Sequence, residues 1–103
     1  MSDSGLKIIE GTALNARQKK DLLNRLARIE GQLRGIQKLI ALAAEPADCD
    51  AVAQQMAAAR KALDRSFVLL LTSCIVNQSD HAQDLAQARA GASRLAAMLD
   101  RFA

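Results

Sequence analysis

The sequence is poor in the residues that most often signal chemistry or a mixed fold. Its 103 residues include no tryptophan or tyrosine, two phenylalanines, one proline and one histidine. With so few aromatic residues, the interior must be filled by leucine, isoleucine, valine and alanine, which suits helix-on-helix packing. A single histidine, without a catalytic His/Asp constellation or a phosphate-binding loop, argues against an enzyme.

Long apolar runs and a targeting segment are also lacking. The N-terminus is mixed and polar rather than signal-like. The longest apolar stretch, residues 67–76, is interrupted by Thr72 and Ser73 and is too short to cross a bilayer. We therefore expect a cytoplasmic protein without membrane contact. In a reducing cytosol, its two cysteines indicate a ligand or redox site rather than a structural disulfide.

The two cysteines, Cys49 and Cys74, lie 25 residues apart in one apolar stripe. The stripe has steps of three or four residues and comprises Cys49, Val52, Met56, Ala59, Leu63, Phe67, Leu70 and Cys74. On a continuous helix the two thiols share a face but stand roughly 37 Å apart. Antiparallel pairing of two copies, about a two-fold axis near residues 61 and 62, would bring Cys49 opposite the other chain's Cys74. The spacing thus predicts a homodimer with two identical cross-chain dithiol sites.

Apolar periodicity predicts an all-α protein with long, long and short helices. We expect an arm over residues 1–12 that is flexible, followed by a single helical domain over 13–103. The helices are expected over about 14–44, 49–77 and 80–102, with the first two forming an antiparallel hairpin. Expected N-caps are Thr12 or Asn15, then Asp48, then Ser79 or Asp80.

Two further features favour association with other copies of the chain. Gly31 and Gly35 lie four residues apart inside the first helix, where a close approach by another helix would explain them. The apolar stripes are also too extensive for one small chain to bury.

Basic residues are concentrated in the first helix. Seven of them, against two acidic residues, lie between Arg17 and Lys38. Such a basic face predicts an acidic partner, with nucleic acid as the first candidate. No segment has the two short helices and tight turn of a helix-turn-helix. The candidate DNA-binding residues are therefore on the flanks of the long helices: Arg17, Lys19, Lys20, Arg25, Arg28 and Arg65.

The segment Arg28-Ile-Glu-Gly-Gln-Leu-Arg-Gly-Ile36 resembles the first-helix signature of the copper-sensitive operon repressor family, whose members sense metals, formaldehyde or sulfur species. The resemblance continues through Cys49 to about residue 80. It implies an all-helical dimer with a four-helix-bundle core, a dimer-of-dimers tetramer, and operator DNA binding in the effector-free state. Arg28 and Arg65 match basic positions implicated in DNA contact in the family.

The resemblance also implies an effector site between protomers, at positions that Cys49, Cys74 and Gln78 occupy here. Copper sensors carry Cys, His and Cys at these positions, so Cys74 replaces the histidine and Gln78 the third ligand. Copper sensors also use a tyrosine and a glutamate, where this chain has Asp48 and, by a loose alignment, Arg94. The only histidine, His81, is a further candidate ligand, although we expect it to be a surface residue near the start of a helix.

The other classes of the family match less well. Nickel and cobalt members rely on several histidines, and formaldehyde sensors on an N-terminal proline where this chain has Ala16 and Arg17. Sulfur sensors have two cysteines and no histidine at the site, but their cysteines occupy the first and third positions, whereas Cys49 and Cys74 occupy the first and second.

The sequence therefore predicts a repressor that is released from operator DNA by an effector captured between Cys49 and Cys74. Cu(I) or another soft metal is the first candidate effector, because thiolates select soft metals. The alternative is a thiol sensor, in which reactive sulfur, an oxidant or an electrophile links the two cysteines covalently. A metallochaperone that does not bind DNA is a third interpretation, and it requires the basic face to be incidental.

Overall fold

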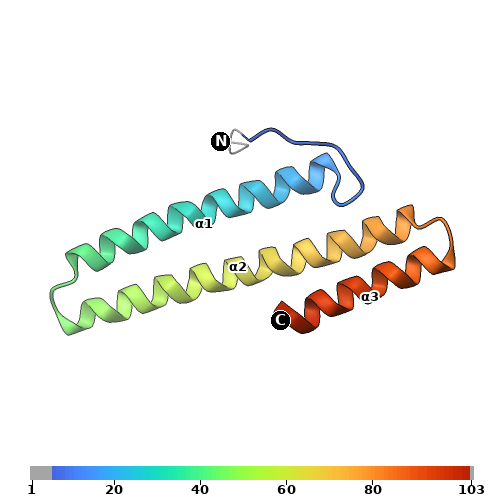
Figure 1. Cartoon of the computed structure of the whole chain (residues 1–103). Helices are drawn as coiled ribbons and strands as arrows, with labels where there is room; N and C mark the ends of the chain where they lie inside the picture. Colours follow the sequence, from blue (N-terminus) through green and yellow to red (C-terminus); the bar gives the residue numbers. More distant parts are fainter. Residues whose placement is uncertain (1–5, 103) are drawn as a thin grey trace.

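The computed structural model describes residues 6–102, and every regular element in that range is an α-helix. Helix α1 spans Ala16–Leu42, α2 spans Pro46–His81 and α3 spans Leu85–Phe102. The predicted all-α class with long, long and short helices is therefore confirmed. Helices α1 and α2 lie side by side as an antiparallel hairpin, and α3 folds back along the C-terminal half of α2 (Figure 1). The result is an elongated molecule of 61 × 31 × 13 Å.

Helix α1 begins at the second of its two predicted caps. The Asn15 side chain accepts a hydrogen bond from the Gln18 backbone N–H (2.8 Å), and Gln18 Oε1 accepts one from the Asn15 N–H (2.9 Å). This reciprocal pair satisfies two backbone donors that would otherwise lack partners at the helix start. Residues 6–15 form no regular element. The predicted arm thus lies partly in this segment and partly in residues 1–5, outside the described residues, and its flexibility stays a prediction.

Two predicted helix starts are wrong. Helix α2 begins at Pro46 rather than Cys49, because proline suits a first helical position, where its missing N–H costs nothing. Asp48 lies inside the first turn, and its carboxylate accepts from the backbone N–H groups of Ala44 and Glu45, both at 2.9 Å. Helix α2 also runs on to His81, so Ser79 and Asp80 continue it instead of opening α3.

The start of α3 is set by a different aspartate. Asp84 Oδ1 accepts from the Gln87 backbone N–H at 2.8 Å, immediately before the helix begins at Leu85. Aspartate is a strong N-cap because its side chain substitutes for the missing preceding carbonyl. A three-residue turn, 82–84, therefore separates α2 from α3.

Asp48 provides a stability prediction. Its hydrogen bonds from Ala44 and Glu45 hold the pKa of this carboxyl below its usual range. A carboxylate with a depressed pKa stabilises the fold at neutral pH and loses that effect as pH falls through its folded-state value. We expect Asp48→Ala to lower the melting temperature by a few degrees at pH 7. The difference from wild type should shrink below about pH 4.

Thermal circular dichroism at several pH values measures this effect. Asp50→Ala is the matched control, because Asp50 lies in the same region of α2 but has no side-chain hydrogen bond among those of residues 6–102. An Asp48→Ala melting temperature equal to that of wild type at pH 7 would contradict the capping role.

The core within one chain is small. Its buried apolar residues are Ile29 and Ile36 in α1, Ala59 and Leu71 in α2, and Leu95 in α3. Leu33 and Leu63, which belong to the predicted apolar stripes, remain 50% and 51% exposed. A single chain therefore leaves much of both apolar stripes exposed to solvent. Association into a dimer or tetramer would cover them, and that association stays a prediction.

The glycines of α1 do not serve packing within the chain. A Cβ added at Gly31 or Gly35 would meet nothing within 4 Å, so the close approach predicted for them is absent between described residues of one chain. The close approach occurs instead at Gly91 in α3. There the side chain of Gln78 occupies the space that a Cβ would need.

None of the helices in residues 6–102 combines the length and apolar character needed to cross a membrane.

Candidate effector site and basic surface

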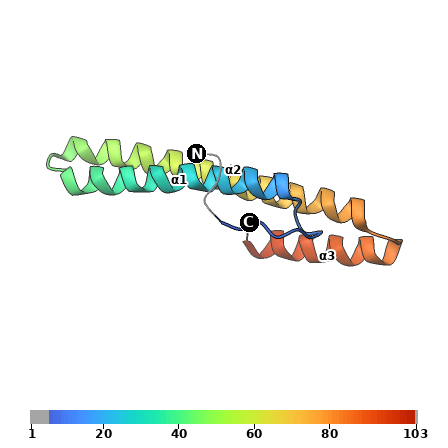
Figure 2. The ribbon, with the colours of Figure 1, turned by 90° about the horizontal axis from the view of Figure 1, so that it is seen from above.

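A cavity of about 360 Å³ lies beside Cys74, where four parts of the chain meet. The segment before α1, the end of α2, the turn after it and helix α3 all contribute to its wall. Figure 2 shows the segment before α1 on the same side of the hairpin as α3. The lining residues are Thr12, Ala13, Cys74, Gln78, His81, Ala82, Gln87 and Arg94. The cavity thus brings together Cys74 and both further candidate ligands of the sequence analysis.

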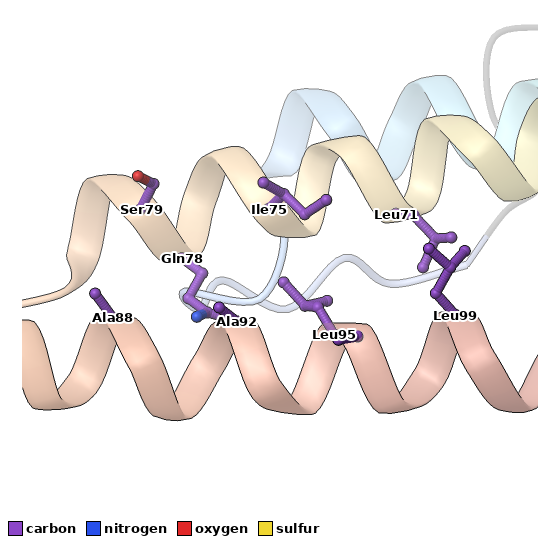
Figure 3. A pocket seen from close by; sticks show the side chains of 9 residues that line it. Leu71, Ile75, Gln78, Ser79, Ala88, Ala92, Leu95 and Leu99 are labelled. Carbon is purple, nitrogen blue, oxygen red and sulfur yellow. The ribbon is translucent and has the colours of Figure 1, made fainter.

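Gln78 links this cavity to α3. Its Oε1 accepts a hydrogen bond from Arg94 Nη2 at 2.8 Å, and its side chain passes over Gly91. Gln78 also lines a second cavity of about 360 Å³ between α2 and α3, whose other walls are mostly apolar, including Leu71, Ile75 and Leu95. Figure 3 shows Gln78 reaching from α2 to Ala92 of α3, at one side of the apolar side chains Ile75, Leu95 and Leu71. An amide in this position is held by α3, which limits its freedom to act as a ligand.

His81 lies at the end of α2 rather than near a helix start, so that part of the prediction is wrong, although the residue is exposed as expected. Its Nδ1 is 2.7 Å from the backbone oxygen of Asn77. Because a carbonyl oxygen only accepts, this contact assigns the proton of a neutral ring to Nδ1. The lone pair then lies on Nε2, as in histidines that ligate metals while their other nitrogen donates to a backbone carbonyl.

Cys49 is remote from this cavity. It is exposed in the first turn of α2, whereas Cys74 is half-buried near the other end of the same uninterrupted helix. A rise of about 1.5 Å per residue again places them roughly 37 Å apart. Within residues 6–102, no three histidine, cysteine or acidic side chains come together in a way that could hold a metal ion. Any site that uses both thiols therefore needs a second chain.

Four lining residues were not predicted as part of a site from the sequence: Thr12, Ala13, Ala82 and Gln87. They carry no motif, and they reach the cavity only because the hairpin and α3 converge there. The resemblance aligned Arg94 loosely with a glutamate of copper sensors, and in the structure Arg94 lines the Cys74 cavity. The wall of the cavity therefore carries a guanidinium group.

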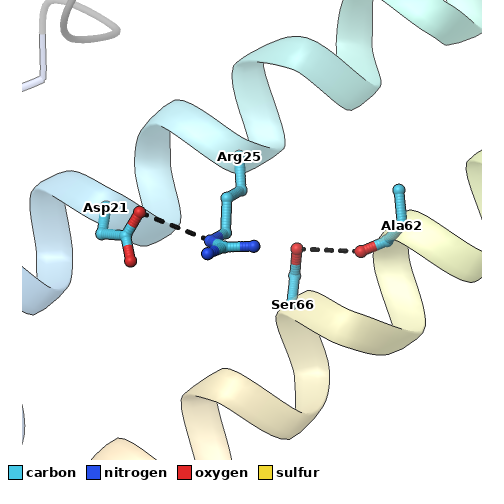
Figure 4. Close-up of polar contacts among 4 residues, drawn as sticks. All are labelled: Asp21, Arg25, Ala62 and Ser66. Atoms are coloured by element: carbon cyan, nitrogen blue, oxygen red, sulfur yellow. Dashed lines mark hydrogen bonds and ion pairs between the residues drawn. The ribbon is translucent and has the colours of Figure 1, made fainter.

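Three of the candidate DNA-binding residues meet at the middle of the hairpin. Arg25 and Arg28 from α1 and Arg65 from α2 line a cavity of about 180 Å³. We refer to these three residues as the arginine cluster. Arg25 Nε lies 3.4 Å from Asp21 Oδ1, and its side chain extends towards Ser66 of α2 (Figure 4). Ser66 donates to the Ala62 carbonyl oxygen (3.0 Å), so its hydroxyl proton is already used within α2. The arginine cluster therefore places three guanidinium groups around one cavity, on two adjacent helices.

The other three candidates, Arg17, Lys19 and Lys20, lie in the first two turns of α1, apart from this arginine cluster. The Lys19 ammonium donates to the Ile9 carbonyl oxygen and so ties the preceding segment to the helix. The first turn of α1 contains no acidic residue. Cations at a helix N-terminus oppose the helix dipole, so their presence does not serve helix stability.

Comparison with known proteins identifies one family. The family model of the metal-sensitive transcriptional repressors matches residues 18–101, which is most of the chain. No curated protein and no solved structure matches the sequence. The matched range includes both cysteines, the arginine cluster, the whole of α2 and all but the outermost residues of α1 and α3. The chain therefore belongs to the family of metal-sensitive transcriptional repressors.

Proposed function

We propose that this protein is a cytoplasmic repressor that binds operator DNA as a homodimer or homotetramer and leaves it when Cu(I) is bound. The effector is captured by Cys49 of one protomer and Cys74 of its partner. The observation that carries this proposal is the position of the two thiols on α2. Cys74 lines a cavity, and Cys49 is exposed near the other end of the same helix.

Cu(I) suits such a site because soft thiolate ligands select it. Two thiolates from two chains would supply the principal donors. The Nε2 atom of His81 is available as a nitrogen donor on the same cavity wall. Gln78 is the weaker candidate, because its oxygen already accepts from Arg94 and an amide is a poor ligand for a soft metal.

The DNA-binding part of the proposal is electrostatic. The arginine cluster of Arg25, Arg28 and Arg65 would contact phosphates together with Arg17, Lys19 and Lys20. Phosphate contacts release counterions, so the affinity for operator DNA should fall steeply with salt. Effector binding would shift the assembly towards a state that fits DNA less well, which is a coupling free energy between separate sites.

A gel-shift titration on the chain's own promoter DNA tests the proposal. The reduced, metal-free protein should bind at low salt, and anaerobic addition of Cu(I) should weaken binding by about 5–150-fold. Ag(I), which is also soft, serves as a redox-inactive comparison, and Mg²⁺ serves as a negative control. Absence of DNA binding at low salt would contradict the repressor function and favour the metallochaperone. Binding that Cu(I) leaves unchanged would contradict Cu(I) as the effector.

A covalent thiol switch is the second candidate, and Arg94 favours it. This cation on the wall of the Cys74 cavity would attract an anionic reagent such as a polysulfide. Two thiols would then lose two protons and pass two electrons to the reagent as a disulfide forms between chains.

Mass spectrometry of the reduced protein separates the two candidates. Exposure to Cu(I) should leave a chelator-resistant copper adduct if the protein senses metal. Exposure to a polysulfide should instead leave a covalent dimer, with or without added sulfur, if it is a thiol switch.

A further inference from the structure

Two amide side chains join the start of α1 to the end of α2. Gln18 Nε2 donates to Asn77 Oδ1 at 3.2 Å, and Asn77 Nδ2 donates to Gln18 Oε1 at 2.5 Å. Asn77 Nδ2 also donates to the Ala13 carbonyl oxygen at 3.2 Å. Asn77 is only 6% exposed, so these groups have little water to replace lost partners. We refer to Gln18 and Asn77 as the amide pair.

On the α1 side, the amide pair is part of the helix cap. The same Gln18 Oε1 that accepts from Asn77 also accepts from the Asn15 backbone N–H. Loss of the amide pair would therefore loosen the cap as well. Gln18 lies among Arg17, Lys19 and Lys20, the basic residues proposed to meet DNA. We refer to this segment, residues 17–20, as the basic first turn of α1. The amide pair thus sets the position of this basic first turn.

On the α2 side, the amide pair adjoins the proposed effector cavity. Asn77 lies one turn after Cys74, and its backbone oxygen is the partner of His81 Nδ1. Ala13, which Asn77 holds through its carbonyl oxygen, lines the cavity together with Cys74 and His81. Asn77 lies between Cys74 and His81 on α2. A ligand that draws Cys74 or His81 towards a second chain would therefore also displace Asn77.

We propose that the amide pair is the element that couples the Cys74 cavity to the basic first turn of α1. In the paired state, α1 is capped and its basic turn is held against α2. In the unpaired state, that turn is released. This inference rests on the proposed function, because it assigns the route by which effector binding reaches the DNA-binding residues.

The amide pair has the physical character of a two-state element. Hydrogen bonds weaken steeply when their geometry is distorted, and an amide–amide pair loses both bonds when one side chain moves away. A buried amide without partners is unfavourable, so partly broken arrangements are poorly populated. A small displacement of α2 at Cys74 would therefore convert one state into the other rather than stretch it gradually.

The test uses near-isosteric variants that delete the amides: Gln18→Met and Asn77→Leu, each in the full chain. Gln37→Met is the matched control, because Gln37 is exposed on α1 and lines neither the Cys74 cavity nor the cavity of the arginine cluster. The operator Kd is measured with and without saturating Cu(I). Wild type and Gln37→Met should show the full Cu(I) effect, of about 5–150-fold, and both amide variants should show less than about threefold. Cu(I) affinity itself should change much less than the Cu(I) effect on operator binding.

A second measurement follows the coupling without DNA. Amide hydrogen exchange over residues 13–20 should be faster in both variants than in wild type, and Gln37→Met should match wild type. Circular dichroism confirms that each variant is folded. In wild type, Cu(I) should produce the same faster exchange in this segment.

The outcomes separate this inference from the function on which it rests. A full Cu(I) effect on operator binding in both folded amide variants would overturn the coupling role and leave the repressor function intact. Unchanged exchange over residues 13–20 in the variants would also overturn it. Failure of wild type to bind operator DNA or Cu(I) would instead overturn the proposed function.

Discussion

Mixed dimers of a Cys49→Ala chain and a Cys74→Ala chain are expected to recover one effector site, although neither variant alone forms any. In the antiparallel arrangement, one of the two cross-chain sites in the mixed dimer receives both intact cysteines, and the other receives both alanines. We expect each single variant to lose more Cu(I) affinity than the roughly 10–100-fold that removal of an outer-shell partner costs. The mixed dimer should bind half as much copper as wild type.

The measurement is copper content and competition with a chromophoric Cu(I) chelator. Two affinity tags isolate the mixed dimer after the chains are denatured and refolded together. Two differently tagged copies of Cys74→Ala, treated in the same way, are the control and should bind no copper. A mixed dimer that binds none, beside a wild type that binds it, would contradict the antiparallel cross-chain site. A Cys74→Ala variant that keeps wild-type affinity would contradict any role for the cavity.

The second large effect is expected on operator binding from Arg28→Gln and Arg65→Gln. These side chains lie on adjacent helices around one small cavity. Each substitution should weaken operator binding roughly tenfold at low salt, since electrostatic phosphate contacts account for much of the affinity. Each should also reduce the slope of log Kd against log salt by about one for every phosphate that the variant no longer neutralises. Fluorescence anisotropy at four or more salt concentrations gives both quantities.

Arg89→Gln is the matched control, because Arg89 is exposed on α3, away from the arginine cluster. It removes the same charge and should leave the salt slope unchanged. Equal effects from Arg89, Arg28 and Arg65 would indicate that net charge, rather than the arginine cluster, determines DNA affinity. Cu(I) affinity should remain at the wild-type value in all three variants.

The helices could be predicted from the sequence because their signals are local. Leu22, Leu26 and Ile29 follow one another at helical spacing, and Pro46 marks the break between the two long helices. The first residues of α2 and α3 were harder to predict, because several aspartates in each region could serve as the N-cap. Asp48 and Asp80 were plausible caps in the sequence, but Pro46 sets the start of α2, and Asp84 accepts the capping bond before α3.

The candidate site was predictable only in part. Cys74 and Gln78 could be named because they lie on one helix at positions that match the family motif. His81 follows seven residues after Cys74, and the bond to the Asn77 backbone that leaves its Nε2 free is visible only in three dimensions. The amide pair joins residues 59 positions apart, and neither glutamine nor asparagine at such positions carries a recognisable pattern.

The family, the helical class and the basic face of this protein follow from short-range features of the chain. Periodicity, composition and a contiguous motif do not depend on how helices cross. The 25-residue spacing of the cysteines likewise suffices to show that the two thiols lie far apart on one continuous helix. The walls of the Cys74 cavity, the Gln78–Arg94 bond and the Gln18–Asn77 pair arise only where α1, α2 and α3 converge. Such contacts depend on the crossing of distant segments, and directional hydrogen bonds form only when that crossing places both partners within about 3 Å of each other.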